Sequence, residues 1–186
     1  MIMQGLGLAR TLVALTATAL ALAGCATVSG QGAGGQGAGS AVDTVEDTIR
    51  FSAGPCFGFC PSYIVTVEPT GSAVLVPQRN TSVPGETSLT VTPAQYRRLR
   101  DAFAPFRPET GTHKRIGHGE NCERVATDMP GYTIVWLRAG QKDTELDFYS
   151  GCFDDRYAAL REAVRAVPAM LEIEAMLKPP RADAAD

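Results

Sequence analysis

Ten consecutive residues, Gly54 to Tyr63, constrain the fold more than any other stretch of this 186-residue chain. They hold Cys56 and Cys60 together with two prolines, two glycines and three aromatic residues. A disulfide removes conformational freedom from the segment that it closes. A bond between these two cysteines would therefore close a small ring around Phe57-Gly58-Phe59 and fix its shape.

Two further cysteines, Cys122 and Cys152, lie in the same part of the chain, beyond the N-terminal leader. An even number of cysteines in an exported domain implies disulfides, and four cysteines allow three connectivities. We favour Cys56–Cys60 with Cys122–Cys152, because the second pair flanks a predicted hairpin at its open end. On the chain-entropy model the long loop contributes about 3.7 kcal/mol and the short ring about 2 kcal/mol.

Two other uses of these cysteines stay open at this point. A zinc site could use all four, although C-x3-C differs from the usual C-x2-C spacing of zinc-binding loops. A redox-active pair at Cys56 and Cys60 would need C-x-x-C spacing and a helix N-terminus to lower the thiol pKa. Cys60-Pro61 instead leads into a predicted strand.

The N-terminus reads as an export signal. Arg10 is followed by an uncharged, mostly apolar run from Thr11 to Ala23, typical of a secretory signal peptide and too short to span a bilayer. Leu22-Ala23-Gly24-Cys25 resembles the lipobox of bacterial lipoproteins. The resemblance implies cleavage before Cys25 and acylation (including palmitate) of that residue, and so a membrane anchor. Ala26 follows Cys25, so no Asp is present there to resemble an inner-membrane retention signal, and by that analogy with lipoproteins we expect the periplasmic face of the outer membrane.

The chain divides into four predicted parts. Residues 1–24 form the lipoprotein signal peptide, and 25–42 the lipidated cysteine with a flexible tether rich in Gly, Ala, Ser and Gln. Residues 43–177 form one folded domain, and 178–186 a disordered tail.

Alternation of apolar and polar residues predicts the first strand, and runs rich in strand-forming residues between turn signals predict the others. Thr92-Pro93-Ala94-Gln95 is a capping box that starts a helix, and Asp154 or Asp155 is expected to cap a final helix that Pro168 kinks or splits. Arg107 to Pro130 reads as a long polar loop.

We predict a single α+β domain with an antiparallel sheet of about five to six strands, two helices packed on one face and stabilising disulfides. The strands are expected at 45–51, 63–68, 72–76, 88–91, 132–137 and 145–149.

The motif from Pro55 to Tyr63, Pro-Cys-Phe-Gly-x-Cys-Pro-x-Tyr, followed by a strand and Thr-Gly, resembles an uncharacterised family of bacterial exported domains, domain of unknown function 6438. The resemblance covers roughly residues 46–165, including Tyr149-Ser150-Gly151-Cys152. It implies a fold and an exported location, and no activity.

The composition narrows the function classes further. A net charge of −3 argues against nucleic acid, which basic residues must neutralise. We expect no enzymatic activity, no cofactor and no metal, and a binding or structural role in the envelope. The expected binding residues are Phe57, Gly58, Phe59 and Tyr63, and the expected partner is an envelope protein or the cell wall. The alternatives are a periplasmic thiol–disulfide redox protein using Cys56 and Cys60, or a metal-binding lipoprotein using His113 and His118.

Overall fold

The computed structural model of the protein describes residues 46–179. The predicted signal peptide, Cys25, the tether and residues 180–186 of the predicted tail lie outside the described residues. Among the residues that are described, no helix is long and apolar enough to cross a membrane.

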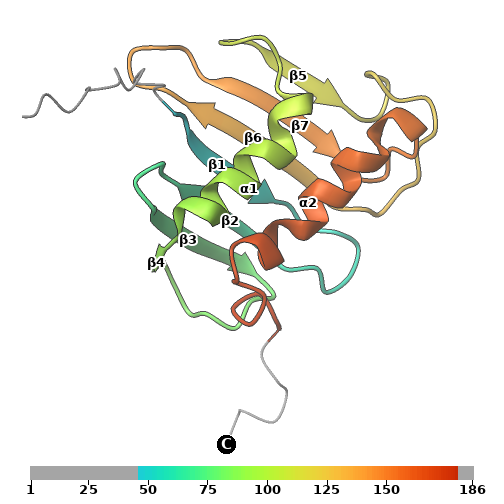
Figure 1. The fold of residues 1–186 in the computed structure, drawn as a ribbon. Helices are drawn as coiled ribbons and strands as arrows, with labels where there is room; N and C mark the ends of the chain where they lie inside the picture. The colour runs from blue at the N-terminus through green and yellow to red at the C-terminus, as the bar shows by residue number, and fades with distance from the viewer. Residues whose placement is uncertain (1–45, 180–186) are drawn as a thin grey trace, which may run out of the picture. The chain divides into compact units, whose positions relative to one another are not determined.

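Seven strands and two α-helices make up the domain, with two short 3-10 helices between them (Figure 1). In chain order they are β1 (Thr48–Ala53), β2 (Ser62–Val67), β3 (Ser72–Arg79), β4 (Thr87–Thr90), α1 (Pro93–Phe103), η1 (Ala104–Phe106), β5 (His113–Ile116), β6 (Gly131–Leu137), β7 (Thr144–Tyr149), η2 (Asp155–Tyr157) and α2 (Ala158–Met170).

The strands form one sheet in the order β4-β3-β2-β1-β6-β7-β5. The α+β class is confirmed, but the expected five to six strands are corrected to seven. The extra strand is β5, which pairs with β7 in parallel, so the sheet is not purely antiparallel. β5 was missed because three of its four residues, His113 to Arg115, are polar and exposed. Such a short edge strand has no hydrophobic alternation to reveal it.

Both helices pack across one face of the sheet, as expected (Figure 1). The core lies between the two layers, where fully buried side chains of the strands meet those of the helices. These side chains include Ile49, Phe51, Val65, Ile134 and Leu146 from the sheet, and Leu99, Phe103, Leu160 and Val167 from the helices.

The helix ends agree with the sequence in one case and differ in the other. At α1 the capping box is present, with the Thr92 hydroxyl accepting from the Gln95 N–H. At η2 and α2 no side chain caps the N-terminus, so the expected Asp154 or Asp155 cap is corrected. Pro168 sits in the last turn of α2, where it does not split the helix.

The opposite face of the sheet is covered by neither helix. Because side chains alternate along a strand, the residues between the core positions point to this face, among them Ser52, Ile64, Thr133 and Asp147. All four are half-buried. We call this surface the open face.

Candidate functional site

Residues 56–60 form a loop between β1 and β2, and we call it the aromatic loop. The Cys56–Cys60 disulfide closes it. Its start is fixed to the segment before β6, because the Phe57 N–H donates to the Asp128 carbonyl at 3.2 Å. Its end is held by Asn80, whose side-chain amide donates to the Cys60 carbonyl at 3.1 Å. The loop is therefore constrained by one covalent bond and two hydrogen bonds.

Both phenylalanines of the aromatic loop point into solvent. Phe57 is 89% exposed and Phe59 is 85% exposed, whereas Phe153, the third exposed large hydrophobic residue of the described part, is 39% exposed. Gly58 stands between them with φ +142°, a backbone conformation that L side chains rarely adopt. The glycine thus allows the turn that separates the two rings.

Tyr63 is placed differently from the phenylalanines with which the sequence grouped it. It is only 3% exposed, and its ring lies 6.0 Å from that of Phe51 in the core. Burial, with a smaller contribution from Tyr132, raises the pKa of Tyr63 well above its ordinary value. The phenol therefore stays neutral near pH 7 and belongs to the scaffold beneath the loop.

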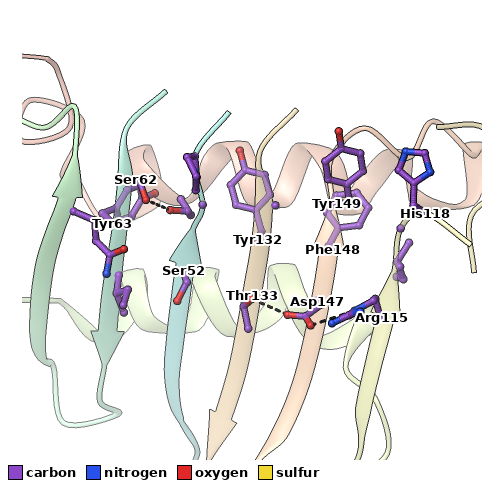
Figure 2. A pocket seen from close by; sticks show the side chains of 18 residues that line it. Ser52, Ser62, Tyr63, Arg115, His118, Tyr132, Thr133, Asp147, Phe148 and Tyr149 are labelled. Carbon is purple, nitrogen blue, oxygen red and sulfur yellow. Dashed lines mark hydrogen bonds and ion pairs between the residues drawn. The ribbon is translucent and has the colours of Figure 1, made fainter. Parts of the chain in front are cut away.

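A hollow of about 530 Å³ lies on the open face beside the aromatic loop (Figure 2). Its volume falls in the range of small-molecule sites. Gly54 and Gly131 contribute no side chains there, and a Cβ on Gly54 would come within 3.1 Å of the Gly131 carbonyl oxygen. Pro55 of the loop segment lines the hollow, as do Tyr149 and His118, whose rings are 6.1 Å apart. The hollow therefore reaches Pro55, the residue directly before the aromatic loop.

Asp147 is the centre of a charged cluster that borders the hollow (Figure 2). Its Oδ1 accepts from the Thr133 hydroxyl at 2.7 Å, and its Oδ2 lies 2.9 Å from His113 Nε2 and 3.7 Å from Arg115 Nε. Glu145 is 3.7 Å from the same His113 nitrogen. One ligand atom each from His113, Glu145 and Asp147 lie within 4.8 Å of one another, so these three could hold a metal ion.

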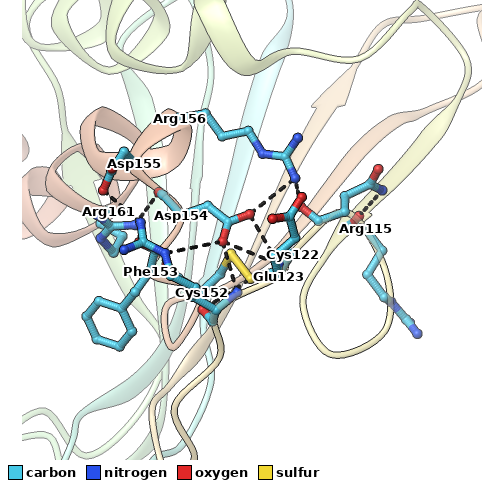
Figure 3. Close-up of polar contacts among 11 residues, drawn as sticks. Arg115, Cys122, Glu123, Cys152, Phe153, Asp154, Asp155, Arg156 and Arg161 are labelled. Carbon is cyan, nitrogen blue, oxygen red and sulfur yellow. Dashed lines mark hydrogen bonds and ion pairs between the residues drawn. A yellow bond between two sulfur atoms is a disulfide. The ribbon is translucent and has the colours of Figure 1, made fainter.

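A second polar cluster surrounds Asp154 beside the Cys122–Cys152 disulfide (Figure 3). The Asp154 carboxylate accepts from the backbone N–H groups of Arg124 at 3.0 Å and Glu123 at 3.2 Å, and from the Arg156 guanidinium at 3.2 Å. The Arg124 N–H above all, with the other two donors, holds the pKa of Asp154 below its usual range. This cluster joins the segment before β6 to the start of the last helix, so its role is to stabilise the fold.

The two disulfides argue against the zinc site that would use all four cysteines, whereas a redox-active pair would also form a disulfide when oxidised. Both favoured pairs, Cys56–Cys60 and Cys122–Cys152, are present. With all four sulfurs in disulfides, the four-cysteine zinc site does not form. Cys60 leads through Pro61 into β2, so the element that directly follows the loop is a strand and supplies no helix N-terminus to lower a thiol pKa.

The structure also brings together residues that the sequence did not connect. His113 and His118 were considered as a metal pair, yet within residues 46–179 His118 belongs to no cluster of metal-ligating side chains. His113 instead meets Glu145 and Asp147. The sequence places Glu145 and Asp147 two residues apart in a predicted strand, and so on one face of it. It gives no sign of His113 as their partner, because His113 lies in the segment predicted as a long loop.

Comparison with known proteins extends the picture only to the family. No curated protein and no solved structure matches the chain. A family model with the description Domain of unknown function (DUF6438) matches residues 47–171. This range begins one residue before β1 and ends one residue after α2, so it covers the whole sheet, both helices and both disulfides. The chain therefore belongs to the DUF6438 family.

Proposed function

We propose that the protein is a lipid-anchored binding module of the bacterial cell envelope, without enzymatic activity, whose aromatic loop docks into an apolar pocket of an envelope protein. The observation that carries the proposal is the exposure of Phe57 and Phe59, at 89% and 85%. Exposed apolar groups on a folded domain point to an interaction site. Aromatic side chains are also prominent among the residues that dominate binding energy at protein interfaces.

The rigidity of the loop supports the same proposal. A loop that is already held in its bound shape loses less conformational entropy on association. The Cys56–Cys60 bond and the Phe57–Asp128 hydrogen bond supply that preorganisation. Phe153 offers a useful contrast, because the Arg161 guanidinium lies 5.4 Å from the centre of its ring and covers part of it.

The aromatic loop lies away from the end of β1 at which the chain enters the domain. The predicted lipidated residue, Cys25, precedes β1, and the aromatic loop follows β1. A six-residue strand is about 20 Å long. The loop and the point at which the chain enters the domain are therefore at opposite ends of β1. We place the protein on the periplasmic face of the outer membrane, from its lipobox and the residue after Cys25.

The test compares partner capture by three forms of the tagged full chain, expressed in its own host and cross-linked before purification. The forms are the natural protein, the double variant Phe57→Ser/Phe59→Ser, and the control Phe153→Ser. We expect the natural protein and the control to recover the same envelope protein. The amount of that protein recovered with the double variant should be about tenfold lower. A reciprocal purification from the partner should recover the natural chain. Equal recovery by all three forms would refute the proposal.

A further inference from the structure

Three side chains on two neighbouring strands form a set of metal ligands that the proposed function does not use. β5 and β7 run parallel, with His113 opposite Glu145 and Arg115 opposite Asp147. Residues two apart share a face of a strand, so His113, Glu145 and Asp147 all lie on the open face. The set is therefore built on paired strands and not on a loop.

A side chain on β6, the other neighbour of β7, orients Asp147. The Thr133 hydroxyl on β6 donates to Asp147 Oδ1 at 2.7 Å (Figure 2). The other carboxylate oxygen, Oδ2, lies 2.9 Å from His113 Nε2. Metal-ligating carboxylates are characteristically hydrogen-bonded by a second layer of residues that fixes their orientation. Thr133 occupies that position here.

The charges around the three ligands also fit a divalent cation. Glu145 and Asp147 supply two carboxylates to the set, and Arg115 Nε lies 3.7 Å from Asp147 and 3.9 Å from Glu120. Glu120 therefore offers Arg115 a second carboxylate partner. A bound divalent cation would balance the charges of the two ligand carboxylates.

We propose that His113, Glu145 and Asp147 bind a first-row divalent transition metal ion, for which Zn²⁺ is the probe. One imidazole nitrogen and two carboxylate oxygens suit such ions, and Zn²⁺ sites with three protein ligands keep a fourth position for water or another ligand. The side chains of the three ligands are 49%, 38% and 24% exposed, so that position opens to solvent. Because Asp147 also lines the hollow, the ion would sit at its border.

The experiment measures Zn²⁺ binding to the full chain by equilibrium dialysis with elemental analysis. The chain has five cysteines, of which four are in disulfides, so the protein is prepared as Cys25→Ser, which removes the fifth cysteine and with it the predicted site of acylation. His113→Ala and Asp147→Asn are the test variants, Thr133→Val tests the orienting hydroxyl, and His118→Ala is the matched control. Circular dichroism checks folding, and His113→Gln replaces His113→Ala if that variant does not fold.

We expect one saturable Zn²⁺ per chain. Each test variant should weaken binding about tenfold or more, since even the loss of an orienting second-layer group has effects of that size. His118→Ala should bind as the parent does. The proposal is overturned by the absence of saturable binding, by unchanged affinity in His113 and Asp147 variants, or by an equal loss in His118→Ala. These results are independent of partner capture by the aromatic loop, which uses other residues.

Discussion

The backbone N–H of Phe57 donates a hydrogen bond to the carbonyl oxygen of Asp128, and this contact joins the aromatic loop to a segment 71 residues later in the chain. Asp128 lies just before β6, in the part of the chain that the Cys122–Cys152 bond and the Asp154 cluster also hold. The orientation of the exposed rings therefore depends on tertiary structure as well as on the small disulfide ring.

The two disulfides should differ in their effect on stability. Removing the long-range bond with Cys122→Ala/Cys152→Ala should lower the free energy of unfolding by about 3.7 kcal/mol, and Cys56→Ala/Cys60→Ala by about 2 kcal/mol. Urea unfolding of both double variants measures the two losses. The small ring should instead show its effect in hydrogen exchange, with faster exchange of the Phe57 amide. A larger loss of stability from the small ring would contradict this account.

Asp47 clamps the start of β1 to two other parts of the domain. It is 6% exposed and pairs with Arg107 and with Arg138 Nε, the latter at 2.8 Å. Asp47→Asn removes the charge from two charge-assisted hydrogen bonds, so we expect a loss of about 2 kcal/mol in unfolding free energy. Glu46→Gln is the matched control, since the Glu46–Arg100 pair is about one-third exposed on both sides. Its loss should stay within about 1 kcal/mol, and equal losses would argue against the clamp.

The stability of the domain should depend on pH through Asp154. The folded protein lowers the pKa of this carboxyl, chiefly through the Arg124 N–H. A lowered pKa stabilises the fold above the unfolded value of about 3.9, and that contribution is lost as pH falls through the folded value. Asp154→Asn should therefore be less stable than the natural protein at about pH 6, with the gap narrowing toward about pH 2. A gap that stays constant in urea unfolding across this range would contradict the prediction.

Local sequence signals were sufficient for most of the sheet and for α1. The alternation in β1, the run of strand-forming residues in β6 and the capping box at Thr92 each depend on neighbouring residues, and each was readable. The disulfide pairing was also within reach, because the β6–β7 hairpin brings Cys122 and Cys152 together. The strands and the capping box follow from neighbouring residues, and the Cys122–Cys152 pairing follows from a predicted hairpin.

Features that depend on tertiary contacts escaped the sequence. β5 is stabilised as a strand by pairing with β7, and its residues His113 to Arg115 give no sign of burial. Asp154 was expected to cap a helix, but its carboxylate is taken by N–H groups about 30 residues earlier in the chain. The exposure of Phe57 and Phe59 agrees with the binding role expected for them, but it has no direct local signal, because apolar residues are more often buried than exposed.

The central claim is that the aromatic loop contacts an envelope protein, and a photoreactive phenylalanine analogue tests it most directly. The analogue p-benzoyl-phenylalanine is placed at position 57 or 59 of the full chain in living cells, and at position 153 as the control. We predict that both loop positions yield the same covalent adduct with one envelope protein, identified by mass spectrometry, and that position 153 does not. No protein adduct at either loop position, an adduct with lipid alone, or the same adduct from position 153 would contradict the claim.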